Sequence, residues 1–116
     1  MTKSNSISSP LEIAARLLAT GEKFTLVTII KAKGSTPRKA GSRMIVYPNG
    51  EIFSSIGGGA VERLAIESAR KSMKSGEIEY LKLNLNDMAH ESTGMICGGN
   101  VELMIEPFGH KPRLFI

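Results

Sequence analysis

The sequence predicts an α/β fold, a single compact domain with a mixed β-sheet of about five strands and two main helices. Three observations predict it. The length of 116 residues suits one compact domain. Two segments carry apolar residues at helical spacing, and several short apolar segments are bounded by glycine- or proline-containing turns. The hydrophobic fraction of 41% and the charged fraction of 22% are typical of a globular protein.

The first helix has a complete start signal. Residues 1–8 are rich in Ser, Asn and Lys and predict a disordered N-terminal tail. Ser9 can cap the helix, Pro10 suits its first turn, and Glu12 completes a capping box. Gly21 is placed to end the helix.

A buried strand and a hairpin follow. Phe24–Ala32 is rich in β-branched residues and apolar in its middle, which predicts a strand covered on both faces. Arg43–Tyr47 and Glu51–Ser55 flank a Pro48-Asn49-Gly50 turn. Because Asn-Gly favours tight hairpin turns, these two segments predict an antiparallel pair.

The second half of the chain predicts one helix and two more strands. The helix follows three consecutive glycines and ends at Gly76. Ile78–Leu85 alternates apolar and polar residues as a strand does, and residues 86–98 form a polar loop. Val101–Ile105 is the last clear strand, which Pro107 is expected to end.

The last residues, 109–116, allow two interpretations. They contain an apolar run that begins after Pro112 and continues to Ile116. It is either an ordinary strand of the same sheet or the first strand of a further domain.

Composition excludes several classes of function. The net charge of +4 is mild, and aromatic residues make up 5% of the chain with no Trp, so we expect no nucleic-acid partner. One cysteine forms neither an intramolecular disulfide nor a Cys-rich zinc site. No apolar run reaches the roughly 18 residues of a membrane span, so we expect no membrane association and a cytoplasmic location.

The loop after the first strand is a candidate anion-binding loop. It contains Ser35, Thr36 and Arg38 beside two glycines. The Arg side chain offers a fork of donors that matches phosphate or carboxylate, and glycine lets backbone N–H groups approach a ligand. A solvated basic turn is the alternative interpretation.

The triple glycine is the second candidate. Gly57, Gly58 and Gly59 lead from a strand into a helix, where exposed N–H groups and the helix dipole favour an anion. The pattern is neither a dinucleotide-binding nor a Walker sequence. Glu62, in the first helical turn, either accepts a hydrogen bond from a ligand amine or only complements the dipole. A tight turn without a ligand is the alternative.

Cys97, Gly98 and Gly99 form the third candidate. A thiol in a glycine turn is available as a nucleophile, a sulfur carrier or a ligand for a soft metal. Free cysteine is also often buried, so inert packing is the competing interpretation. His90 and His110 show no metal-ligand spacing with Cys97, which leaves no zinc site.

Together these segments resemble one known family. In order, GSTPRKAGSRMIV, SIGGGAVE and GMICGGNVELMIEP resemble the N-terminal domain of the XdhC/CoxI family, which are maturation factors of molybdenum enzymes. The resemblance defines residues 9–108 as the XdhC/CoxI-like N-terminal domain. In that family a Rossmann-like domain usually follows, and residues 109–116 resemble its first strand.

The resemblance implies a binding and delivery factor that is not a turnover enzyme. Its cargo would be the molybdenum cofactor (molybdopterin), held during sulfuration and inserted into a xanthine dehydrogenase-type enzyme. The implied partners are that molybdoenzyme, a cysteine desulfurase-like sulfur donor and a second copy in a homodimer. The implied contacts are phosphate on Gly57–Gly59 or Ser35–Arg38, pterin nitrogens on Glu62, and molybdenum or sulfur on Cys97.

Two other functions stay open from the residues. One is a cysteine-dependent transferase that moves sulfur or acyl groups through Cys97. The other is a passive structural partner domain of a dehydrogenase complex.

Overall fold

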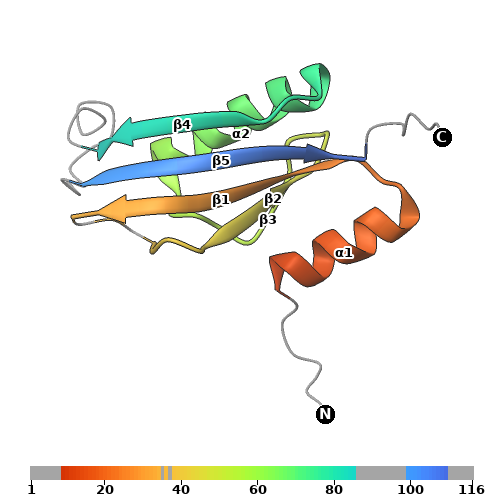
Figure 1. Ribbon diagram of the computed structural model, residues 1–116, viewed down its shortest axis with the longest axis horizontal. Coiled ribbons are helices and arrows are strands. Elements are labelled where there is room, and N and C mark those ends of the chain that lie inside the picture. Colours follow the sequence, from red (N-terminus) through yellow and green to blue (C-terminus); the bar gives the residue numbers. More distant parts are fainter. Residues whose placement is uncertain (1–8, 35, 37, 86–98, 110–116) are drawn as a thin grey trace, which may run out of the picture.

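A computed structural model describes residues 9–34, 36, 38–85 and 99–109, as seven helices and strands. Their order along the chain is α1 (Pro10–Thr20), β1 (Phe24–Lys33), β2 (Arg43–Val46), β3 (Ile52–Phe53), α2 (Gly59–Ser75), β4 (Glu79–Asn84) and β5 (Asn100–Phe108). The five strands form one sheet in the order β3-β2-β1-β5-β4 (Figure 1). The predicted α/β fold with two main helices and five strands is confirmed.

Every strand pair of this sheet is antiparallel, whereas the sequence led us to expect a mixed sheet. The reason lies in the one strand–helix–strand unit. β3 and β4 run in the same direction and are joined by α2, but they occupy opposite edges of the sheet. Parallel strands are therefore present but never neighbours.

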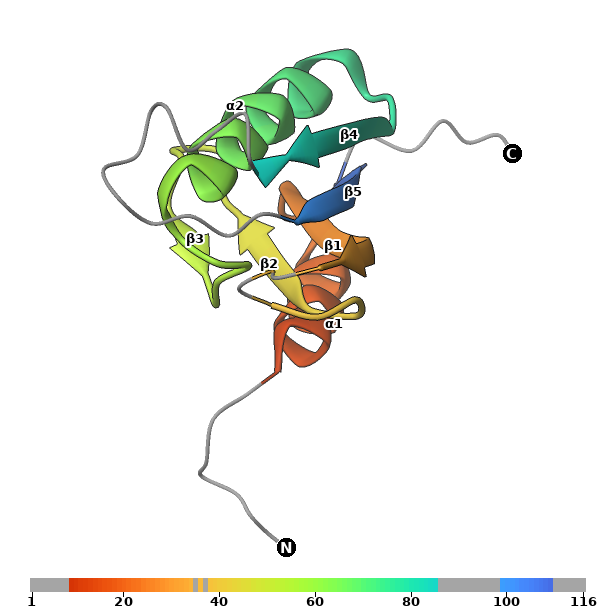
Figure 2. The same ribbon diagram turned by 90° about the vertical axis from the view of Figure 1, so that its left-hand side faces the viewer.

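The two helices cover opposite faces of the sheet and create two cores (Figures 1 and 2). Val27 and Ile29 of β1 pack in the core beneath α2, while Phe24 and Leu26 pack in the core beneath α1. This alternation explains why six consecutive residues of β1, Phe24–Ile29, are buried. The Phe24 and Phe108 rings stack with their centroids 5.2 Å apart.

Local signals set the ends of the helices as predicted. Ser9 Oγ accepts a hydrogen bond from the Glu12 amide at 3.2 Å, and Glu12 Oε1 accepts one from the Ser9 amide at 2.8 Å. This is the predicted capping box. Gly21 and Gly76 end α1 and α2 in the left-handed conformation.

The prediction that Pro107 ends the last strand is wrong. β5 continues to Phe108, and Pro107 pairs with Thr25 of β1. β4 begins opposite Ile105, so Pro107 lies where β5 has a neighbour on one side only. A residue without an amide proton is tolerated there.

Most of the two predicted tails falls outside this description. Residues 1–8, residues 110–116 and the predicted loop at 86–98 lie outside the described residues. The division into a tail, a domain at 9–108 and a second tail therefore stays a prediction.

Candidate functional site

The described ends of all three candidate segments lie at one end of the sheet. β1, β3 and β4 run in one direction, and β2 and β5 run in the opposite direction. The loop that begins at Gly34 follows β1, the glycine turn (Gly57–Gly59) follows β3, and Gly99 leads into β5. These ends therefore share the left-hand end of the sheet in Figure 1.

The glycine turn is held together from within. Ser55 Oγ accepts a hydrogen bond from the Gly57 amide at 3.0 Å, and Glu62 Oε2 accepts one from the Gly58 amide at 3.0 Å. The Ser55 hydroxyl also donates to Glu62 Oε2. The carboxylate of Glu62 thus stabilises the N-terminus of α2, as its dipole favours. A contact between Glu62 and a ligand amine stays a prediction.

The backbone of this turn requires glycine at position 58, and the space around Gly58 and Gly59 is unoccupied by other atoms of the described chain. Gly58 has φ 78° and ψ −179°, a conformation that is essentially restricted to glycine. A Cβ placed on Gly58 or Gly59 would meet no atom within 4 Å. The first amides of α2 have no acceptor within the helix, so a ligand can approach the backbone here.

The loop between β1 and β2, here named the basic loop, borders a hollow beside the glycine turn. The Thr36 hydroxyl donates to the Arg38 carbonyl at 3.0 Å, and Arg43 Nη1 donates to the Gly41 carbonyl at 3.4 Å. Arg38 itself is exposed. The hollow measures about 420 Å³ and is called the arginine hollow below; it is lined by Ser9, Pro10, Leu11, Arg38, Gly41, Ser42, Arg43, Ser54 and Ser55.

The arginine hollow brings two of the predicted segments together. Arg38 comes from the basic loop, and Ser55 holds the amide of Gly57 in the glycine turn. Sequence analysis missed Arg43 and Ser54. Arg43 begins β2 beside the basic loop, which was the available signal, but only the strand pairing shows that it lines this hollow.

The third segment is described only at its end. Gly99 is buried, and its carbonyl accepts a hydrogen bond from the Leu85 amide at 2.8 Å, which joins the ends of β4 and β5. Ser35, Cys97 and Gly98 lie outside the described residues. Their roles stay predictions.

Two further observations concern the described part of the chain. Within it, no group of three or more His, Cys, Asp or Glu side chains is arranged to hold a metal ion. Neither of its helices combines the length and the apolar character needed to span a membrane.

Comparison with known proteins identifies the family. A model of the XdhC and CoxI family matches residues 17–83. The chain belongs to the XdhC and CoxI family. The matched residues include the basic loop and the glycine turn, so the resemblance seen in the sequence is confirmed.

Two similar proteins are longer than this member of the XdhC and CoxI family. It is 31% identical over 103 residues to the uncharacterized protein YqeB of Escherichia coli (strain K12), covering 89% of this chain and 19% of YqeB. It also resembles the crystal structure of a xanthine dehydrogenase from Bacillus halodurans, with a TM-score of 0.73 and a sequence identity of 25%. That match covers 86% of this chain and 30% of the other. The chain thus spans less than a third of either protein.

Proposed function

We propose that this chain binds the molybdenum cofactor and helps deliver it to a xanthine dehydrogenase-type molybdoenzyme. The observation that supports this most directly is that the basic loop and the glycine turn meet at the arginine hollow, at the sheet end where β5 also begins. Membership of the XdhC and CoxI family supports it independently.

The cargo has an end that suits this site. Molybdopterin carries a terminal phosphate, and two arginines with several serine hydroxyls line the arginine hollow. Arginine binds phosphate with paired hydrogen bonds, and hydroxyls add further donors. The open backbone at Gly59 lets a phosphate approach the amide at the start of α2, next to this group.

Other residues would act on the remainder of the cargo. In this proposal Cys97, which leads into β5 through Gly98 and Gly99, contacts molybdenum or carries the sulfur delivered by a cysteine desulfurase-like donor. Glu62 already accepts hydrogen bonds from Gly58 and Ser55 and so keeps the turn in shape, and in this proposal its carboxylate also contacts the pterin nitrogens.

Equilibrium dialysis of the purified chain against molybdenum cofactor tests the proposal. We expect retention with a Kd in the micromolar range or better, which corresponds to about −8 kcal/mol. Absence of retention, both by this chain and by a longer family member that contains the matching domain, would contradict the proposal. Retention combined with catalytic turnover that Cys97→Ser abolishes would instead favour a transferase.

A further inference from the structure

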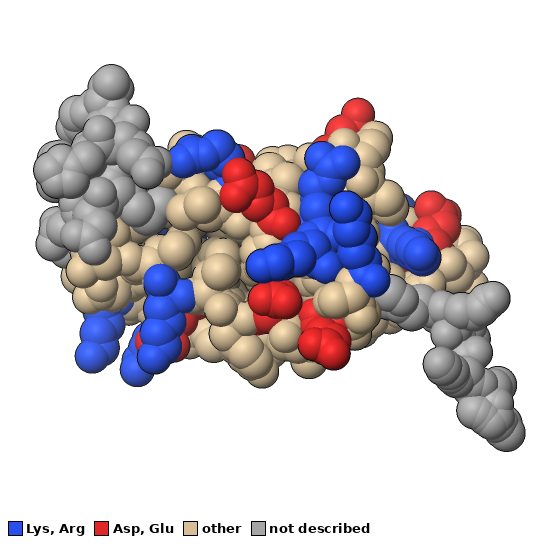
Figure 3. Space-filling view, turned by 90° about the horizontal axis from the view of Figure 1, so that it is seen from above, with Lys and Arg blue, Asp and Glu red and all other residues tan. Residues whose placement is uncertain are grey.

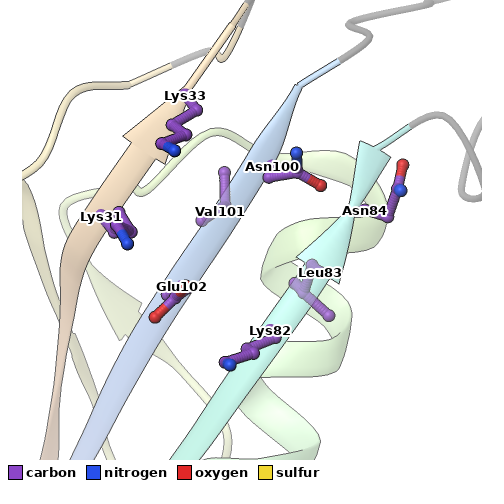
Figure 4. Close-up of a pocket in the computed structure, with 8 residues that line it drawn as sticks. All are labelled: Lys31, Lys33, Lys82, Leu83, Asn84, Asn100, Val101 and Glu102. Atoms are coloured by element: carbon purple, nitrogen blue, oxygen red, sulfur yellow. The ribbon is translucent and has the colours of Figure 1, made fainter.

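A second polar hollow lies on the sheet face opposite α2. It measures about 270 Å³ and is lined by Lys31, Lys33, Lys82, Leu83, Asn84, Asn100, Val101 and Glu102. We call it the lysine pocket. Figure 4 shows its three lysines on the near side of the sheet, with α2 behind the strands. It shares no lining residue with the arginine hollow.

The register of the strands determines which side chains line the lysine pocket. Lys31 of β1 and Lys82 of β4 both pair with Glu102 of β5, the strand that lies between β1 and β4. Neighbouring strands lie about 4.8 Å apart, so the two lysines stand on either side of β5, roughly 10 Å apart at the backbone. In the next row, Lys33 and Asn84 pair with Asn100.

A β-bulge places two of the lysines on this face. The register of β1 against β5 shifts between Ile29 and Lys31, which leaves Ile30 unpaired. Before the bulge, odd-numbered residues such as Ile29 face the core beneath α2. After it, Ala32 packs against that core, and Lys31 and Lys33 face the other side. Bulges commonly redirect side chains in this way beside functional sites.

The charges of the pocket are unbalanced. Three ammonium groups surround one carboxylate, that of Glu102. The lining therefore carries a net positive charge, which favours a bound anion. Another basic hollow is lined by Lys23 and by Arg70 and Lys74 of α2. It differs from the lysine pocket because its Arg70 side chain packs over the hairpin turn. The Nη1 atom of Arg70 lies 3.2 Å from the position that a Cβ on Gly50 would take.

Figure 3 shows where basic side chains gather on another face of the molecule. One dense group lies right of centre, and a second projects at the lower left. The left-hand side is also the end of the sheet at which β1 ends and β5 begins. The lysine pocket lies at this same sheet end, since Lys33 directly precedes Gly34 and Asn100 directly follows Gly99.

We propose that the lysine pocket binds a small oxyanion of the phosphate class. Lysine binds phosphate as a compact point charge, and the Asn100 amide can donate a further hydrogen bond. A volume of about 270 Å³ lies just below the range of about 300–1,000 Å³ usual for drug-sized ligands, which suits a phosphate or pyrophosphate group. The proposal does not depend on cofactor binding at the arginine hollow.

Titration of isotope-labelled protein with pyrophosphate, followed by backbone amide NMR shifts at constant ionic strength, tests the proposal. We expect saturable shifts at Leu83 and at Asn100–Glu102, with a Kd near 1 mM, or about −4 kcal/mol. Lys33→Gln and Lys82→Gln should each weaken binding about three- to fivefold, as for exposed charge-assisted contacts. Lys71→Gln, which removes an equal charge from an exposed position of α2, should leave the Kd unchanged.

Two results would overturn the proposal. The first is a chloride titration that produces the same shifts, because that indicates general screening. The second is a hexaglutamate peptide that shifts these amides at a hundredfold lower concentration, because that indicates an acidic protein surface as the partner.

Comparison of inorganic phosphate with glycerol phosphate then identifies the source of the anion. Tighter binding of the ester assigns the pocket to the phosphate end of a larger ligand, and tighter binding of the inorganic ion assigns it to free phosphate. Either result supports an oxyanion site. Since neither probe contains a pterin, failure here would leave the cofactor proposal intact.

Discussion

The carboxylate of Glu62 accepts a hydrogen bond from the backbone amide of Gly58, four residues earlier, at 3.0 Å. This contact closes the first turn of α2 over the glycine turn, together with the bond between Glu62 and Ser55. An acidic side chain that sequence analysis offered as a ligand contact therefore also has a structural role.

Glu62→Ala should lower the free energy of unfolding by about 1 kcal/mol, in the range found when helix N-caps are removed. The loss arises because the Gly58 amide and the Ser55 hydroxyl lose their acceptor. Urea denaturation monitored by circular dichroism measures it. Glu67→Ala, at an exposed position of the same helix, is the control and should change stability by less than about 0.5 kcal/mol.

Gly58→Ala should destabilise the chain by about 1–3 kcal/mol through backbone strain alone. A Cβ at Gly58 meets no atom within 4 Å, so no steric clash contributes. Gly21→Ala is the matched control, because Gly21 also has positive φ and open space around its Cβ position. Its φ of 77° and ψ of 16° lie in the left-handed helical region, which alanine tolerates better. Equal losses for the two variants would contradict the assignment of special strain to Gly58.

Gly109→Ala should be more damaging than either. A Cβ there would lie 2.4 Å from the Glu22 carbonyl oxygen and 2.6 Å from Lys23 Cα, both backbone atoms that cannot move aside cheaply. The positive φ of 87° adds strain. We expect a loss of about 3 kcal/mol or more, since overpacking and strain add. A thermal unfolding midpoint close to that of Gly21→Ala would refute the close approach.

Arg38→Ala should weaken molybdenum cofactor retention about tenfold, if the arginine hollow receives the phosphate as proposed. Stability should change little, because Arg38 is exposed. Equilibrium dialysis of the variant measures the affinity. Lys71→Ala removes the same charge from α2 and should bind as the unmodified chain does, so a similar loss in both variants would point to a nonspecific charge effect.

Local structure was the part of this fold most accessible from sequence. The capping box of Ser9 and Glu12 and the hairpin turn at Asn49-Gly50 involve residues close in the chain, and the structure contains both. The error at Pro107 has a different origin. Proline is excluded from a strand only where a neighbouring strand needs its amide, and whether one does at Pro107 depends on where β4 begins.

The residues of the candidate site likewise divide into those visible in local sequence and those placed by pairing between distant strands. Arg38 and the three glycines were visible as local motifs. Arg43 became visible as part of the arginine hollow only through its place on β2, and the lysines of β1 only through a bulge set by pairing with β5. No short stretch of sequence encodes that register, since the two strands come from opposite ends of the domain.

The pairing of β1 with β5 also affects how the chain folds during synthesis. Within the described part of the chain, β1 is synthesised well before β5, with which it pairs in the sheet. Until β5 emerges, one edge of β1 has no hydrogen-bonding partner, and β4 has no neighbour in the sheet. Long-range pairing of this kind slows folding, so β1 presents an open apolar edge until β5 has been synthesised.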